Sequence, residues 1–148
     1  IYEPNLDECF YAWKDGGAYL NGKKIHVSDQ HEMKNALLAT GFPYYDYGKL
    51  EGYIELFTYF ARHTSGLRRL GSAAVDLAYT ACGRVEGFYE YGLHAWDVAA
   101  GIVIVKEAGG TITDLKGGND YIFGAELLAS NTVLHPLLLE AAKAHFRY

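Results

Sequence analysis

Short apolar runs and turn signals divide the first part of the chain into strands. Aromatic and alternating residues predict strands at residues 9–13 and 18–20 and a third ending near residue 27. Asp15-Gly16-Gly17 and Asn21-Gly22 separate them, and such pairs favour tight turns between antiparallel strands. Further strands are predicted at residues 35–40, 67–70, 85–91, 111–114 and 126–129.

Four longer segments, three between these strands and one after the last of them, have the apolar spacing of helices. They cover residues 47–63, 72–82, 95–108 and 134–146. Ser72 is placed to cap the second helix through its hydroxyl, and Gly83 and Gly109 end the second and third. Because strands and helices alternate, the sequence predicts one α/β domain over residues 1–148, a layered α/β sandwich with a mixed sheet.

Composition narrows the class of protein. Half of the 148 residues are hydrophobic, about a fifth are charged, and the formal net charge is −5. This balance predicts a soluble protein without a nucleic-acid-binding surface, and residues 99–105 are too short an apolar run for a membrane span. Cys9 and Cys82 lack CxxC spacing and are interpreted as buried free thiols, which indicates a cytoplasmic location.

The beginning of the chain bears on any functional prediction. The first residue is Ile1, and the only methionine is Met33. This start predicts a processed or partial product. The function can therefore depend on residues that precede Ile1.

Asp97 is the most conspicuous candidate for chemistry. It lies near the start of the otherwise apolar segment 95–108, in the predicted first turn of a helix. An acid there is stabilised by the helix dipole by roughly 0.3–1 kcal/mol, so a purely structural interpretation is open. The neighbouring Trp96 is interpreted as a packing anchor.

Glu90 supports a functional interpretation of Asp97. It ends the predicted strand 85–91 and precedes Asp97 by seven residues across a short connection. The end of a strand and the start of the next helix meet at the edge of a sheet where α/β proteins bind ligands. Two carboxylates facing one pocket suit Mg²⁺ or ligand hydroxyls between them. Zinc is less favoured, because the six histidines are scattered.

Gly71-Ser72-Ala73 is a third candidate at the start of the second predicted helix. Glycine followed by small residues allows a ligand to approach free backbone N–H groups closely. An ordinary helix cap explains the same residues equally well.

Together these motifs resemble the inositol monophosphatase family, a branch of the sugar-phosphatase superfamily. WDVAAG at residues 96–101 with EAGG at 107–110 is similar to the family's second signature, and RRLGSAA at 68–74 is similar to its RxxGSAA segment. The resemblance implies the C-terminal part of the sugar-phosphatase fold and a homodimer, beside the cytoplasmic location and the lack of a nucleic-acid partner expected from the cysteines and the charge. The family's first signature, DPxDGTxN, is absent, so most of its metal ligands would lie upstream of Ile1.

The resemblance also implies roles for individual residues. Asp97 is expected to be catalytic as a Mg²⁺ ligand, and Glu90 to bind substrate hydroxyls. Gly71, Ser72 and Ala73 are expected to line the substrate site. The implied reaction is Mg²⁺-dependent hydrolysis of inositol monophosphate or a similar small polyol phosphate, with little activity expected of residues 1–148 alone.

Other functions stay open at this point. The same fold family includes fructose-1,6-bisphosphate and 3′-phosphoadenosine 5′-phosphate phosphatases. A non-catalytic dimerisation or binding module is the alternative from a different class, since some relatives contact the transcription machinery.

Overall fold

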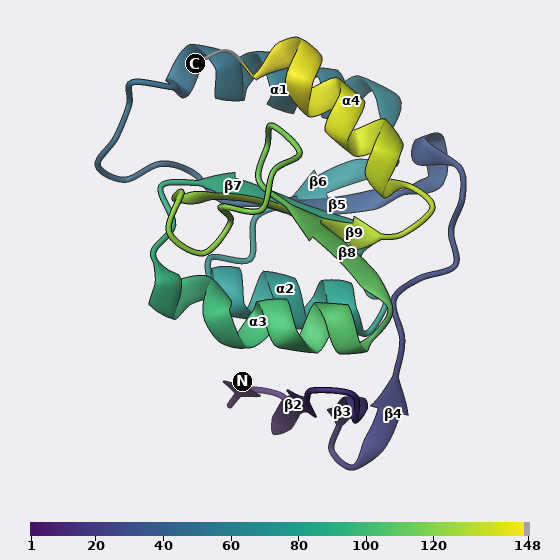
Figure 1. Ribbon diagram of the computed structural model, residues 1–148. Coiled ribbons are helices and arrows are strands. Elements are labelled where there is room, and N and C mark those ends of the chain that lie inside the picture. Colours follow the sequence, from purple (N-terminus) through teal and green to yellow (C-terminus); the bar gives the residue numbers. More distant parts are fainter. Residues whose placement is uncertain (147–148) are drawn as a thin grey trace.

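The computed structural model describes residues 1–146, and these form four stacked layers (Figure 1). Helices α1 and α4 cover one face of a five-stranded sheet, and α2 and α3 cover the other face. A small sheet of the N-terminal strands lies beyond α2 and α3, with α3 contacting β2 and β3. The predicted layered α/β architecture is confirmed.

The regular elements follow the expected alternation. The helices are α1 (Leu50–His63), α2 (Ala73–Ala81), α3 (Ala95–Glu107) and α4 (His135–His145), with a short 3₁₀ turn η1 at Met33–Asn35. The strands of the small sheet are β1 (Tyr2–Glu3), β2 (Glu8–Trp13), β3 (Gly17–Leu20) and β4 (Lys23–Ile25). The strands of the large sheet are β5 (Leu37–Thr40), β6 (Gly66–Arg68), β7 (Gly87–Tyr91), β8 (Gly110–Thr113) and β9 (Glu126–Asn131).

The large sheet is mixed, as predicted. Its strand order is β6-β5-β7-β9-β8. Strand β5 runs parallel to both β6 and β7, whereas β9 runs antiparallel to β7 and β8. The small sheet, β1-β2-β3-β4, is antiparallel throughout and contains the predicted meander. Because β5 and β7 are parallel neighbours, their carboxyl ends open onto the same edge of the sheet.

Several predicted boundaries are wrong by a few residues. Helix α1 starts at Leu50 rather than residue 47, because the Asp46 side chain accepts a hydrogen bond from Gly48 N at 2.8 Å and holds a turn there. Strand β5 starts at Leu37, since Asn35 closes the 3₁₀ turn. The two-residue strand β1 was not predicted.

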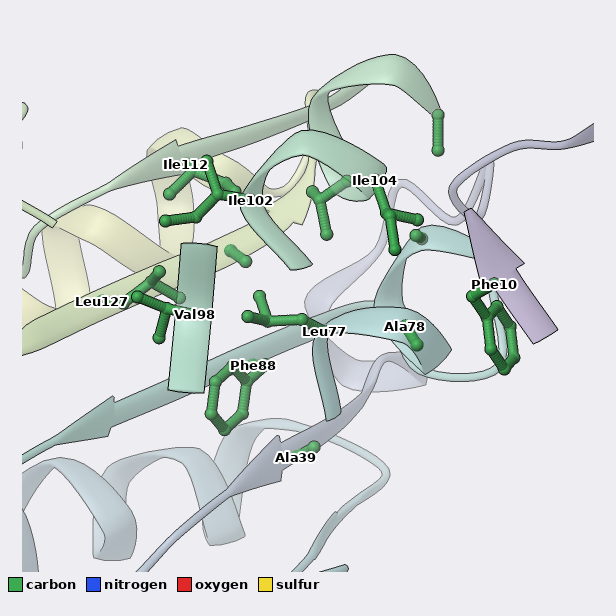
Figure 2. Close-up of a cluster of buried hydrophobic side chains, with 14 of the residues drawn as sticks. Phe10, Ala39, Leu77, Ala78, Phe88, Val98, Ile102, Ile104, Ile112 and Leu127 are labelled. Carbon is green, nitrogen blue, oxygen red and sulfur yellow. The ribbon is translucent and has the colours of Figure 1, made fainter. Parts of the chain in front are cut away.

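Two buried clusters hold the layers together, one on each face of the large sheet. In the cluster shown in Figure 2, Leu77 of α2 and Val98 of α3 pack above Phe88 of the sheet, and none of the three is exposed. Helix α3 is apolar around much of its circumference because it lies between the two sheets. Gly101 allows α2 and α3 to touch, since a Cβ at that position would lie 2.6 Å from Leu77 Cβ.

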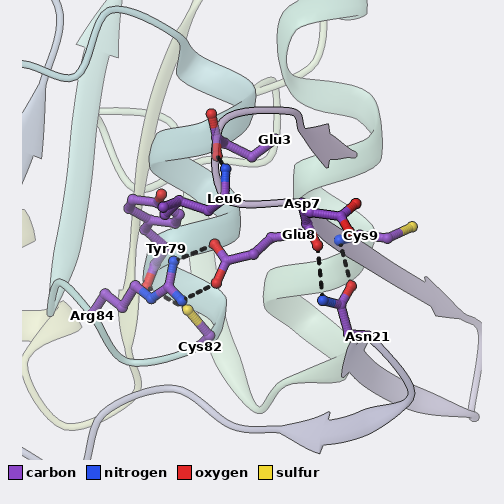
Figure 3. A network of polar contacts seen from close by, with 9 residues as sticks. All are labelled: Glu3, Leu6, Asp7, Glu8, Cys9, Asn21, Tyr79, Cys82 and Arg84. Atoms are coloured by element: carbon purple, nitrogen blue, oxygen red, sulfur yellow. Dashed lines mark hydrogen bonds and ion pairs between the residues drawn. The ribbon is translucent and has the colours of Figure 1, made fainter.

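Polar contacts join the small sheet to the helices. The Glu107 carboxylate at the end of α3 accepts hydrogen bonds, both at 2.9 Å, from Asp15 N in the turn after β2 and from Gly17 N at the start of β3. Arg84 donates to both carboxylate oxygens of Glu8 and lies over the ring of Tyr79, 4.5 Å from its centroid (Figure 3). Glu107 is thus a structural tie between α3 and the hairpin.

The cysteines differ from the prediction in one respect. Both are free, but Cys9 is exposed and Cys82 is half-buried. Cys9 lies on the outward face of β2, because the inward face of that short strand is taken by Phe10. Over the part of the chain that the structure describes, no helix has the length and apolar content needed to span a lipid bilayer.

Candidate active site

A cavity of about 650 Å³ opens at the edge of the large sheet where β5 and β7 end. Its walls are Gly41 after β5, Glu90 near the end of β7, the starts of α2 and α3, and the loop of residues 42–46. Ligands of α/β proteins bind at this kind of edge, outside the carboxyl ends of strands. All five residues singled out from the sequence, Gly71, Ser72, Ala73, Glu90 and Asp97, line this cavity.

Asp97 is the third residue of α3, in the first turn as predicted. Its Oδ2 accepts a hydrogen bond from the backbone N–H of His94, the N-cap residue, at 2.9 Å. This bond fixes the carboxylate at the helix N-terminus, where the dipole also favours a negative charge. The side chain is half-buried at the cavity wall, so it can also contact a ligand.

Glu90 is held deeper, with 9% of its surface exposed. Gly41 lies against it, since a Cβ at Gly41 would be 2.1 Å from the Glu90 carboxylate. Burial, followed by the charges of Asp76 and Asp97, raises the pKa of Glu90 to about 8. A carboxyl group with these neighbours can hold or release a proton near neutral pH.

Asp76 was not singled out from the sequence, yet it is the most deeply buried acid of the cavity, with 1% of its surface exposed. It lies in the first turn of α2, and burial raises its pKa to about 7. Its Oδ1 has no hydrogen-bond partner in the part of the chain described. An acid inside the apolar segment AAVDLA of residues 73–78 was the available sequence signal.

The start of α2 differs in one respect from the prediction. Ser72 is the N-cap residue with extended backbone, but its hydroxyl makes no capping hydrogen bond. The side chain instead lies exposed at the cavity wall, and Gly71 before it has a left-handed backbone, with φ of 96°. The N–H groups of the first turn therefore lack a side-chain cap beside the cavity.

The rim of the cavity is aromatic and carries a positive charge. The Arg69 guanidinium lies 5.6 Å from the ring centroids of both Phe42 and Tyr44 and donates to the Tyr44 hydroxyl. Trp96 is not a packing anchor: 79% of its surface is exposed, because it lies at the outer start of α3 and stacks on His94 at the cavity rim.

The residues present supply part of a metal site. Within residues 1–146, no group of three or more His, Cys, Asp or Glu side chains could hold a metal ion. Mg²⁺ usually binds one or two carboxylates and fills its other positions with water or substrate oxygens. Asp97, fixed and accessible, fits a single carboxylate ligand, so further protein ligands would have to come from outside the described residues.

A layered α/β protein with an acid-lined cavity at its strand ends belongs to the class that binds small polar ligands at this edge. More narrowly, the chain belongs to the inositol monophosphatase family, whose model matches residues 1–147. The family is one of phosphatases, which agrees with the resemblance carried by the two motifs at residues 68–74 and 96–110.

Individual relatives agree with this assignment. The chain is 38% identical to an inositol-1-monophosphatase from Mesorhizobium japonicum, over 97% of this chain and 54% of the relative. It is 39% identical to a protein from Pseudomonas aeruginosa named Nus factor SuhB, over 98% of this chain and 54% of the relative. The structure of an inositol monophosphatase from Anabaena (Nostoc) sp. superposes with a TM-score of 0.93 and 39% identity, covering 98% of this chain and 57% of that one. The chain thus spans about half the length of the relatives it matches.

Proposed function

We propose that the intact protein is a Mg²⁺-dependent phosphatase that hydrolyses inositol monophosphate or a similar small polyol phosphate to the free alcohol and phosphate. The observation that carries this proposal is that Asp97 and Glu90 line one cavity, at the edge of the sheet, in a chain of the inositol monophosphatase family. The inositol-1-monophosphatase from Mesorhizobium japonicum supports this choice of substrate class.

Asp97 is the proposed catalytic residue and the Mg²⁺ ligand in this chain. Its hydrogen bond from His94 N holds one carboxylate oxygen and leaves the other oxygen available for a cation. When bound, the ion would neutralise charge on phosphoryl oxygens and lower the pKa of a bound water.

Glu90, Gly71, Ser72 and Ala73 are the proposed contacts to the alcohol part of the substrate. The Glu90 carboxylate accepts hydrogen bonds from ring hydroxyls, and its burial strengthens them. The uncapped first turn of α2 offers N–H donors and, because its side chains are small, lets a sugar-like ring approach. These residues bind and orient the alcohol and exclude water around it.

Residues 1–148 are proposed to be the C-terminal portion of a larger subunit, with the remaining metal ligands outside them. The 54% coverage of the relatives and the incomplete ligand set within residues 1–146 support this proposal. The test compares phosphate release from myo-inositol 1-phosphate by the full-length encoded protein and by residues 1–148, each with Mg²⁺ and with EDTA. Activity is expected only for the full-length protein with Mg²⁺, and equal activity of the shorter chain would refute the shared site.

We also propose that the intact enzyme prefers inositol monophosphate to other phosphate esters. Fructose 1,6-bisphosphate and 3′-phosphoadenosine 5′-phosphate are the competing substrates within the superfamily. Assays with these two compounds beside myo-inositol 1-phosphate rank the three by kcat/KM. The proposal predicts the highest value for the inositol ester.

A second candidate function is a binding role without catalysis, favoured by the relative from Pseudomonas aeruginosa that is named a Nus factor. A pure binding module would show no Mg²⁺-dependent phosphate release at full length.

We further propose that the protein is a cytoplasmic homodimer without direct contact to nucleic acid. The assembly is tested by light scattering of the full-length protein.

A further inference from the structure

Within residues 1–146, no hydrogen-bond partner of its side chain explains why Asp76 is buried. It is the fourth residue of α2, 1% exposed, and its helix continues past it through ordinary backbone bonds such as Asp76 N to Ser72 O at 2.9 Å. Burying a carboxylate without partners costs free energy, so a residue of this kind usually has a counter-charge or a set of donors.

The described chain supplies neither of these in full. Oδ1 of Asp76 has no hydrogen-bond partner among residues 1–146. The positive charge of Arg69 acts to lower the pKa of Asp76, against the larger effect of burial. The Arg69 side chain is exposed, and its guanidinium donates a hydrogen bond to the Tyr44 hydroxyl. The acceptor capacity of Asp76 is therefore unfilled within the described residues, and the residue lines the cavity.

Glu90, in β7, lines the same cavity as Asp76. It also accepts no hydrogen bond from the described part of the protein, and Gly41 occupies the space on one side of it. Two carboxylates from different elements, α2 and β7, thus present unfilled acceptors to one cavity. A ligand that brings two or more hydroxyl donors on one rigid ring satisfies both acceptors, whereas an ester without hydroxyls satisfies neither.

We propose that Asp76 is a specificity-determining residue whose carboxylate accepts a hydrogen bond from a hydroxyl of the polyol part of the substrate, beside the hydroxyl bound by Glu90. This inference rests on the proposed phosphatase function of the same cavity. Asp76 does not take part in phosphoryl transfer. Its effect is confined to substrates that carry hydroxyl groups.

The test compares two phosphate monoesters in the full-length protein with Mg²⁺. The substrates are myo-inositol 1-phosphate, which carries ring hydroxyls, and phenyl phosphate, which carries none. Asp76→Asn is expected to lower kcat/KM for the inositol ester by about tenfold, and Asp76→Ala by at least as much, the loss expected for a hydrogen bond to a charged group. Values for phenyl phosphate stay within about twofold of the wild type, as expected of a group that does not contact the reacting atoms.

A matched control separates this effect from charge in general. Glu140→Gln removes an exposed acid of α4, remote from the cavity lining, and leaves both substrates unchanged. Thermal denaturation checks that the Asp76 variants fold, and Asp76→Asn is expected to be no less stable because it removes a buried charge.

Each result decides the inference. Equal losses for both substrates, or no loss for the inositol ester, overturn it while leaving the phosphatase proposal intact. If the wild type releases no phosphate from either ester, the proposed function fails, and binding of free myo-inositol, followed by ligand-observed NMR, then decides on Asp76. Binding that weakens about tenfold in Asp76→Asn supports the inference, and absent or unchanged binding refutes it.

Discussion

The Glu90 carboxylate lies against the bare α-carbon of Gly41, so closely that a Cβ there would stand 2.1 Å from it. Gly41 directly follows β5, and Glu90 lies in the parallel neighbouring strand β7, at the edge where the cavity opens. Gly41 has no left-handed backbone that would demand glycine. Its role is therefore to leave room for the acid.

Replacing Gly41 by alanine is predicted to displace Glu90 without changing the backbone. The Gly41→Ala variant of the full-length protein should lose about tenfold in kcat/KM for myo-inositol 1-phosphate, because the hydrogen bond to the displaced Glu90 carboxyl group is weakened. Phenyl phosphate should be hydrolysed at nearly the wild-type rate. Steady-state kinetics of both substrates measure this, and an unchanged value for the inositol ester would show that Glu90 does not contact the substrate.

The contact between α2 and α3 gives a prediction on stability. A Cβ at Gly101 would lie 2.5 Å from Leu77 Cδ1 and 2.6 Å from Leu77 Cβ. Gly101→Ala should therefore lower the free energy of unfolding by about 1–3 kcal/mol through overpacking. Urea denaturation measures the change, with Ala100→Ser at an exposed position of the same helix as the control. Equal midpoints for the two variants would contradict the close packing.

The pH dependence of stability follows from the two buried acids of the cavity. Their pKa values, about 7 for Asp76 and about 8 for Glu90, lie above the usual range, so the folded state keeps protons that the unfolded chain has lost. Stability is then lost as the pH rises through these values. This loss must be measured above about pH 6.5, the pKa of histidine in an unfolded chain. Burial lowers the pKa of His135 to about 4, so between these two values stability rises with pH and would mask the effect of the acids.

Between about pH 6.5 and 8.5, the free energy of unfolding should fall by about 1–3 kcal/mol in EDTA, where no cation neutralises the acids. Denaturant titrations of the full-length protein at several pH values measure this. Asp76→Asn should show a shallower fall, since it removes one acid and its repulsion of Glu90. A flat profile in the wild type would mean that both carboxyls titrate normally.

The sequence predicted the fold class and part of the site for identifiable reasons. Glu90 and Asp97 are close in the chain, at the end of a strand and the start of the next helix, so alternation alone places them at one edge of the sheet. Gly41 and Asp76 belong to separate elements, and their approach to Glu90 depends on strand order, which local pattern does not encode. Trp96 was misinterpreted because its apolar character predicts burial, whereas its place at the first turn of α3 leaves it at the rim.

The structural role of Glu107 also depends on a contact between distant elements that local sequence pattern does not encode. Glu107 is the last residue of α3 and lies away from the cavity lining. Its two hydrogen bonds reach a turn about ninety residues earlier in the chain, at Asp15 and Gly17. Such a tie requires the small sheet to lie beside α3, which only the tertiary structure reveals.

The most direct test of the proposed function is the Mg²⁺ dependence of phosphate release from myo-inositol 1-phosphate by the full-length protein and its Asp97→Asn variant. Asparagine can still accept the hydrogen bond from His94 N, so α3 should form normally, which circular dichroism checks. The wild type should require Mg²⁺, and the variant should lose at least about a hundredfold in kcat at saturating Mg²⁺. Turnover near the wild-type rate in the folded variant, or wild-type turnover that persists in EDTA, would contradict the role of Asp97 as the metal ligand of this cavity.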